Sequence, residues 1–246
     1  MSMWNRGPMG GGFGGFADDQ AVASSPAVVA FFNAVYGWMA AGLGLTALVA
    51  WLVASNVQTM HAVFSPGTLI LLFIAQMVLV VTIGGAVNRI NANVATILFL
   101  VYSALNGVTL AGLFLIYAQV TLAGTFLVTA VTFGAMSVYG MTTQRDLTRL
   151  GSLLFMFLLG FIIATVANFF FASSALYWLA TYCGVIIFVG LTAYDTQRLK
   201  GLAMQTSGNA EMAARYSVVG ALALYLDFLN LFLLLLRIIG AGNQRR

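Results

Sequence analysis

The chain has 246 residues, of which 61% are hydrophobic and only 7% are charged. A soluble domain carries roughly 25% charged residues, so a chain this poor in charge cannot cover a water-facing surface and is predicted to cross a membrane several times. The net charge of +4 is too small for a patch that tracks phosphates, which excludes nucleic-acid binding as a main activity.

The chain begins with a glycine-rich segment. Residues 1–25 mix polar, apolar and glycine residues without helical periodicity, and they lack the basic start and apolar core of a signal peptide. We expect residues 1–25 to be a flexible cytoplasmic tail. We expect residues 26–246 to form one transmembrane domain.

Apolar stretches of about twenty residues follow Pro26, each long enough to cross a hydrocarbon core of about 30 Å. There are seven, at 29–53, 67–87, 94–118, 122–141, 152–173, 176–199 and 215–239. All three prolines of the chain lie outside the interiors of these stretches, so helices without proline kinks are expected. The predicted fold is an all-α integral membrane protein, a bundle of seven transmembrane helices whose many glycines allow close packing.

The basic residues predict how this bundle is oriented. Cytoplasmic loops are enriched in Lys and Arg, and most basic residues here lie in the tail or beside the connections that follow spans 2, 4 and 6. This distribution predicts a cytoplasmic N-terminus and an external C-terminus. A basic C-terminal end opposes this prediction and leaves open a last span that does not cross fully. The basic residues on the predicted cytoplasmic side are Arg6, Arg89, Arg145, Arg149, Arg198, Lys200 and Arg215. Those on the opposite side are Arg237, Arg245 and Arg246.

Two of the six acidic residues lie inside predicted spans. Asp195 is in the sixth span, and Asp227 lies about twelve residues into the seventh, where a carboxylate is costly and marks a functional site by default. The expected turn at 207–209 lies near the midpoint between them, which predicts similar heights on neighbouring helices. If the two groups face each other, they would share one proton at lower pH, then ionise, repel and attract a cation at higher pH.

A structural interpretation of the same residues stays open. Arg198 at i+3 from Asp195 permits a local ion pair, and Asn230 at i+3 from Asp227 permits a hydrogen bond inside the bundle. Asp227 has no basic residue within a helical turn, which favours the paired carboxylates. Further candidates for a supporting role are Asn106, Tyr194, Tyr225, Thr192 and Arg89.

Several catalytic classes are disfavoured by residue counts. His61, in a short polar loop, and Cys183 are single residues of their type, too few for a zinc site. Lys200 is the only lysine and lies outside the last span, which excludes a retinal Schiff base there. Tyr194-Asp195 resembles one motif of presenilin-like aspartyl proteases, but the Gly-x-Gly-Asp motif is absent before Asp227. We therefore expect no enzyme activity and no bound cofactor.

Two segments resemble a known family. Residues 190–197 (GLTAYDTQ) and 223–232 (ALYLDFLNLF) are similar to the two signature segments of the Bax inhibitor-1 family, the transmembrane BAX inhibitor motif-containing proteins. Residues 36–47 resemble its first span and residues 102–110 its third. The resemblance covers residues 27–240, and the short tail and loops are similar to the bacterial branch.

The resemblance implies a bundle with the last helix at its centre and a pH-sensitive calcium leak gated by an aspartate pair. The pair falls on Asp195 and Asp227. The family also places a basic residue from the second span against this pair, and the only arginine there is Arg89, at the end of the span. Bacterial relatives are linked to the membrane-bound AAA protease FtsH, which would be a partner, with the tail as its natural handle.

These arguments lead to one expectation and one alternative. We expect a cation leak in the bacterial cytoplasmic (inner) membrane, with calcium as the transported ion and Asp195 and Asp227 as proton sensors and weak calcium ligands. Calcium takes about six to eight oxygen ligands, so waters, carbonyls or side chains such as Asn230 and Asn106 would complete its shell. The alternative is a regulatory membrane protein that binds other membrane proteins and transports nothing itself.

Overall fold

The computed structural model describes residues 26–86 and 89–243, so the prediction for the tail at 1–25 lies outside the described residues. Seven helices in the described part are long and apolar enough to cross a membrane, which confirms the predicted class. They are α2 (Pro26–Ala54), α4 (Pro66–Gly85), α5 (Ala92–Leu110) with its continuation α6 (Leu113–Ile116), α7 (Gln119–Thr142), α8 (Thr148–Phe171), α9 (Ser174–Thr206) and α10 (Ala210–Asn243).

Some helix boundaries differ from those predicted. The sixth span was expected to end at residue 199 and the seventh to begin at 215, but α9 continues to Thr206 and α10 begins at Ala210. The turn itself lies at 207–209, as predicted, because the polar ends of both helices extend beyond the apolar stretches. His61 lies in a seven-residue helix, α3 (Val57–Val63), and the prediction that it lies in a loop is wrong.

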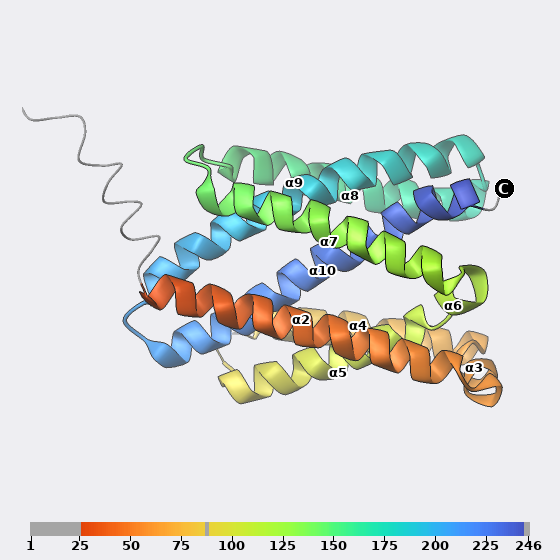
Figure 1. Ribbon diagram of the computed structural model, residues 1–246, viewed down its shortest axis with the longest axis horizontal. Helices are drawn as coiled ribbons and strands as arrows, with labels where there is room; N and C mark the ends of the chain where they lie inside the picture. The colour runs from red at the N-terminus through yellow and green to blue at the C-terminus, as the bar shows by residue number, and fades with distance from the viewer. Residues whose placement is uncertain (1–25, 87–88, 244–246) are drawn as a thin grey trace, which may run out of the picture.

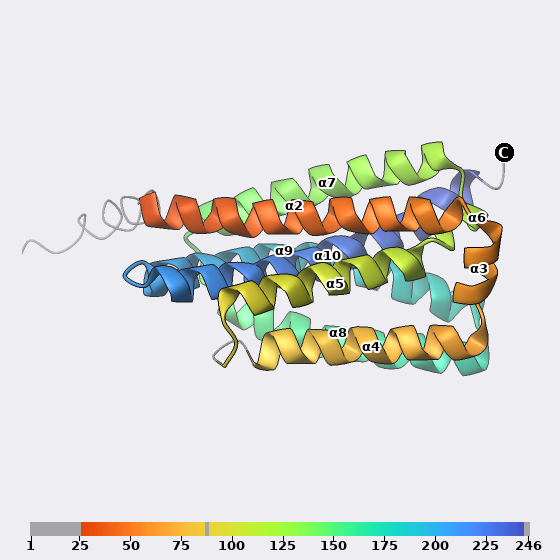
Figure 2. The same cartoon turned by 90° about the horizontal axis from the view of Figure 1, so that it is seen from below.

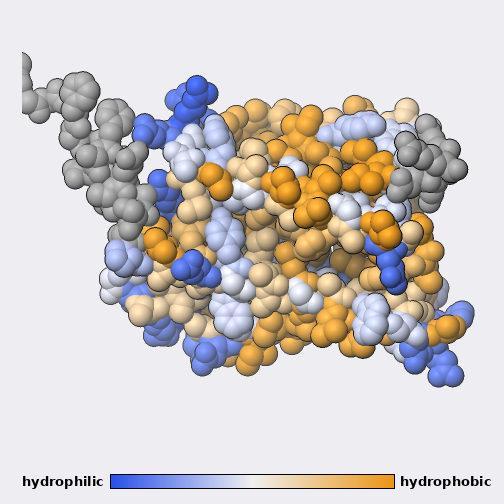
Figure 3. Space-filling view, in the orientation of Figure 1, coloured by the Kyte–Doolittle hydropathy of each residue, from blue (hydrophilic) through white to orange (hydrophobic). Residues whose placement is uncertain are grey.

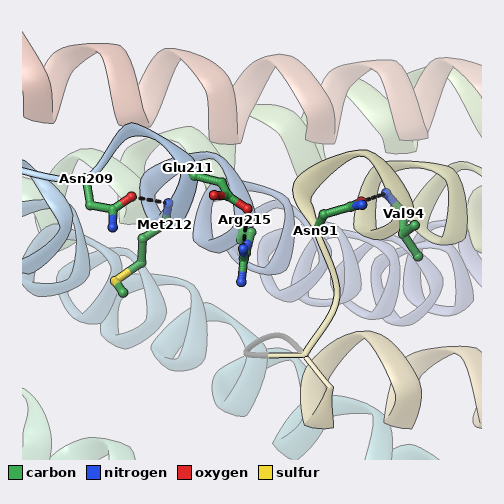
Figure 4. Close-up of polar contacts among 6 residues, drawn as sticks. All are labelled: Asn91, Val94, Asn209, Glu211, Met212 and Arg215. Carbon is green, nitrogen blue, oxygen red and sulfur yellow. Dashed lines mark hydrogen bonds and ion pairs between the residues drawn. The ribbon is translucent and has the colours of Figure 1, made fainter.

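Asparagine side chains start three of the helices. Figure 4 shows two of these caps, in which Asn91 accepts a hydrogen bond from the backbone N–H of Val94 at 2.9 Å and Asn209 accepts one from that of Met212 at 3.0 Å. Each cap satisfies an N–H that has no partner within its own helix. The cap of α10 therefore fixes where the α9–α10 hairpin turns.

The helices form three layers. Figure 2 shows α2 and α7 on one side, α5, α9 and α10 in the middle, and α4 and α8 on the other side. In Figure 1, α10 crosses the bundle diagonally from the end where α2 begins to the opposite end, packing against α2, α5, α7 and α9. In its most apolar stretch 61% of residues are buried, against 39% for α9 and 6% for α4 and α8. The last helix is therefore central, as the family resemblance implies.

Glycines allow the helices around α10 to approach closely. A methyl group at Gly107 on α5 would lie 2.6 Å from the carbonyl oxygen of Thr46 on α2, and one at Gly140 on α7 would collide with the carbonyl of Ala193 on α9. Contacts this close hold membrane helices together by packing, because lipid supplies no hydrophobic driving force between them. The α7–α9 contact also fixes the position of the helix that carries Asp195.

Candidate functional site

The two intramembrane aspartates are brought together by the α9–α10 hairpin. Asp195 on α9 is half-buried, Asp227 on α10 is 5% exposed, and their carboxyl groups lie close enough for a hydrogen bond between them. Two carboxyl groups can form such a bond only when one of them carries a proton. The arrangement is therefore suited to a pair that shares one proton.

Asp227 has hydrogen-bonding capacity left over. Its Oδ2 atom is buried and has no hydrogen-bond partner among the described residues. Its neighbours along the buried faces of α10 are apolar, including Leu224, Phe228 and Leu231. Because leaving a buried acceptor unsatisfied costs about 1–3 kcal/mol, this oxygen is a ready acceptor for a proton, a water molecule or a cation.

A cavity adjoins Asp195. Its volume is about 280 Å³, and it lies between α9, α10 and the end of α4, with Asp195, Arg198 and Tyr216 among its lining residues. The Arg198 guanidinium attracts the Asp195 carboxylate electrostatically but forms no salt bridge with it. In the described part of the chain the only salt bridge joins Glu211 and Arg215 in the first turns of α10 (Figure 4), so the alternative of an Asp195–Arg198 ion pair is not realised.

Arg89 is not brought to the pair. It is exposed in the connection between α4 and α5, where its backbone N–H donates to the carbonyl of Ala86 at 2.8 Å. No salt bridge joins it to another residue that the structure describes. The arginine contact implied by the family resemblance is therefore absent in this arrangement, because this arginine lies beyond the end of its helix.

Three of the predicted supporting residues bond within their own helices. The amide of Asn230 donates at 2.8 Å, that of Asn106 at 2.9 Å and the hydroxyl of Thr192 at 2.8 Å, each to the carbonyl four residues earlier. None of these three bonds joins the aspartates. Asn230 shares a helical face with Asp227, being one turn further along α10.

The two predicted tyrosines contact other helices. The hydroxyl of Tyr225, which is fully buried, lies 2.7 Å from that of Thr46 on α2, and its ring meets that of Phe99 on α5 edge to face at 5.6 Å. The ring of Tyr194 fills the space that Gly151 leaves on α8. Both residues therefore hold α9 and α10 in place rather than touch the carboxyl groups.

Gln197 is a residue that sequence reasoning missed. Its side chain accepts a hydrogen bond from the backbone N–H of Leu147 at 2.9 Å and donates one to the carbonyl of Arg145 at 2.8 Å. The amide thus binds the α7–α8 connection to α9, two residues beyond Asp195. Its place in the segment 190–197 was the only available signal, because its partners lie about fifty residues away in the sequence.

The same connection contains an acidic residue outside the membrane spans. Asp146 accepts a hydrogen bond from the backbone N–H of Thr148 at 2.9 Å. Hydrogen bonds from the side chain and backbone of Thr148 lower the pKa of Asp146, so it stays ionised beside the first turn of α8, where a negative charge is favoured. It is an exposed structural carboxylate and serves as a control for the buried pair.

The described residues contain no cluster of three or more His, Cys, Asp or Glu side chains that could hold a metal ion. Two carboxylates supply at most four of the six to eight oxygens that calcium takes, at about 2.3–2.6 Å. A cation at this pair would therefore keep waters and bind weakly. Weak binding is what conduction requires, because an ion must also leave.

Comparison with known proteins gives a consistent result along nearly the whole chain. The model of the family described as "Inhibitor of apoptosis-promoting Bax1" matches residues 28–244. The chain is 47% identical to the inner membrane protein YbhL of Escherichia coli over 229 residues, 92% of this chain and 97% of the relative. It is also 47% identical to an uncharacterized protein of Borreliella burgdorferi, over 88% of this chain and 92% of the relative. A third relative, the uncharacterized protein RP147 of Rickettsia prowazekii, is 40% identical over 86% of this chain and 88% of its own length.

Proposed function

This chain belongs to the Bax inhibitor-1 family, and we propose that it is a pH-sensitive leak for cations, calcium preferred, gated by Asp195 and Asp227. The observation that carries the proposal is a pair of carboxyl groups within reach of each other inside a transmembrane bundle, with one buried oxygen left unpartnered. The name of the E. coli relative, an inner membrane protein, supports placing this chain in the cytoplasmic membrane.

Protonation of the pair favours the closed state. The shared proton joins α9 to α10 at the centre of the bundle. When the proton leaves, a hydrogen bond worth about 1.5–3 kcal/mol is lost, and two charges about 4 Å apart repel by about 4 kcal/mol at an effective dielectric constant of 20. A change of about 5.5 kcal/mol is enough to turn an open-to-closed ratio of 1:99 into 99:1. The loss of one proton is therefore enough to open the leak.

The route for the ion is open on one side of the pair and closed on the other. The cavity lined by Asp195 and the exposed Arg198 is the entry to this route. Beyond Asp227, the ring of Phe228 lies 5.2 Å from that of Phe126 and 5.6 Å from that of Phe133, measured between centroids. Apolar constrictions of this kind block ions by excluding water, so opening must separate α10 from α7 at these rings.

The open cavity faces the cytoplasm in our proposal. The end of the bundle where α2 begins also carries the connections α4–α5, α7–α8 and α9–α10 (Figure 1). Among the described residues, six basic side chains lie in or beside these connections, whereas Arg237 lies near the opposite end. The excess of positive charge on cytoplasmic loops supports an N-terminus inside, which would let cytoplasmic protons and cations reach Asp195.

Calcium flux into liposomes that contain the purified protein tests the proposal. We expect flux to be greater at about pH 8 than at about pH 6, and the Asp195→Asn/Asp227→Asn variant to lose this difference, since amides do not titrate. Asp146→Asn, which changes an exposed carboxylate, should behave as the wild type. Flux no greater than in empty liposomes at either pH would refute the leak and favour the alternative, a regulator that binds other membrane proteins such as the AAA protease FtsH.

A further inference from the structure

A lateral groove lies between α2 and α7. Along α10, the residues that line the groove follow Asp227, whereas those that line the cavity at Asp195 precede it. The volume of the groove is about 230 Å³. The central helix α10 forms its floor, and α6 closes one end. Figure 3 looks onto this face and shows hydrophobic side chains bordering a recess between α7 and α2. We define the groove by six of its lining residues, Leu43, Ala47, Leu113, Ala123, Phe126 and Phe228.

The groove opens sideways, toward the surroundings of the bundle. Ala47 and Ala123 on its two rims are exposed, and the side chain of Phe126 is 45% exposed. One helical turn further along each rim helix, Trp51 on α2 and Leu127 on α7 are large, apolar and exposed. Because these helices are membrane spans, the opening faces the hydrocarbon of the bilayer.

The chemistry of the lining excludes water and ions as stable occupants. Thr46 is the only residue with a polar side chain in the lining, and its hydroxyl is already engaged, lying 2.9 Å from the carbonyl oxygens of Gly42 and Ser103 and 2.7 Å from the hydroxyl of Tyr225. A buried water needs two to four polar partners, which the groove does not offer. The occupant that is both apolar and abundant at this depth is a lipid acyl chain.

The groove is lined by a residue that adjoins the carboxyl pair in the sequence. Phe228 forms part of its floor and follows Asp227 directly in the sequence, and Phe126 forms part of its wall while packing on Phe228 at 5.2 Å between centroids. An occupant of the groove therefore touches both rings whose separation would open the apolar constriction. We propose that the groove binds the acyl chain of a membrane phospholipid, and that this chain stabilises the closed state of the leak.

Filling the groove with a larger side chain tests whether a lipid occupies it. Protein extracted from membranes of phosphatidylethanolamine and phosphatidylglycerol is examined by native mass spectrometry, which counts the phospholipids retained. Ala123→Phe and, independently, Ala47→Phe should lower retention about tenfold, because the ring takes the volume of the acyl chain and its contacts are lost. Gly124→Phe is the matched control, since a side chain there meets open space. Equal retention in the wild type, both groove variants and the control would overturn the proposal.

The proposed effect of the acyl chain on the closed state rests on the proposed leak. Flux measurements distinguish a failure of this effect from a failure of the leak itself. The groove variants should change the flux ratio between about pH 8 and about pH 6 by at least about threefold, while Gly124→Phe should leave it unchanged, because only the groove variants alter contacts on Phe228 and Phe126. Lost lipid with unchanged flux would refute the regulatory role and retain the lipid site. Lost lipid with no flux in any form, wild type included, would refute the leak itself.

Discussion

Replacing Asp227 with asparagine separates the charge of the pair from its shape. The substitution Asp227→Asn keeps the volume of the side chain and supplies an amide N–H that donates to Asp195 at every pH. In the wild type above the titration range, two buried negative charges face each other. In the variant, a hydrogen bond to a single charge replaces their repulsion, so the contact between α9 and α10 no longer responds to protons.

The size of the effect follows from the burial of the site. Repulsion of about 4 kcal/mol at a separation of about 4 Å is replaced by a charged hydrogen bond worth about 1.5–3 kcal/mol. The sum, about 6 kcal/mol, corresponds to a change of about 10⁴-fold in the equilibrium between closed and open states. Asp227 is only 5% exposed, so little of this difference is lost to solvent screening. We expect flux at about pH 8 to fall to the wild-type value at about pH 6.

The assay is calcium entry into liposomes across a series of pH values, with each protein reconstituted at equal density. Asp146→Asn controls for the loss of an acidic residue, because Asp146 is exposed in the α7–α8 connection and lies outside the pair. A pH profile of Asp227→Asn that matches the wild type would refute the reasoning, since it would mean that the titrating group lies elsewhere. Loss of flux in Asp146→Asn as well would point to a general effect on the bundle.

Four further predictions follow from individual contacts. Tyr225→Phe removes the hydrogen bond to Thr46 and should lower the free energy of unfolding in detergent by about 1 kcal/mol; no change would mean that the contact is not formed. Gln197→Ala should speed amide hydrogen exchange in residues 143–147, because two hydrogen bonds to that connection are lost. Arg198→Ala should change flux by less than about twofold, since the guanidinium is exposed and screened. The protein should cleave no transmembrane peptide; cleavage that both Asp→Asn changes abolish would instead identify an aspartyl protease.

The number of spans could be predicted because hydrophobicity along the chain is a local property. Each apolar stretch of about twenty residues satisfies its own backbone hydrogen bonds as a helix in hydrocarbon, without help from its neighbours. The lengths of α9 and α10 were underestimated for the same reason, because the polar ends of these helices are not hydrophobic. Residues 200–206 and 210–214 extend the helices beyond the apolar stretch, where hydropathy carries no signal and the Asn209 cap sets the boundary.

The candidate site was only half predictable. Asp195 and Asp227 are conspicuous in sequence because carboxylates in apolar runs are rare, and a hairpin places them at similar heights. The roles of Tyr194 and Tyr225 were not predictable, because each lies next to or near an aspartate in sequence but points to another helix. Gln197 was missed because its partners belong to a connection distant in the sequence.

The sequence by itself determined the class of protein, the seven spans and the two carboxyl groups at membrane depth, because each follows from composition within one helix. Only the tertiary structure decided which side each helix turns toward α10. In water, an apolar stripe reveals the buried face of a helix. In a bilayer the core and the surroundings are both apolar, so that stripe disappears. The rotation of α9 and α10 that joins Asp195 to Asp227 is therefore set by packing against all their neighbours, through contacts such as Gly140 on Ala193 and Tyr225 on Thr46.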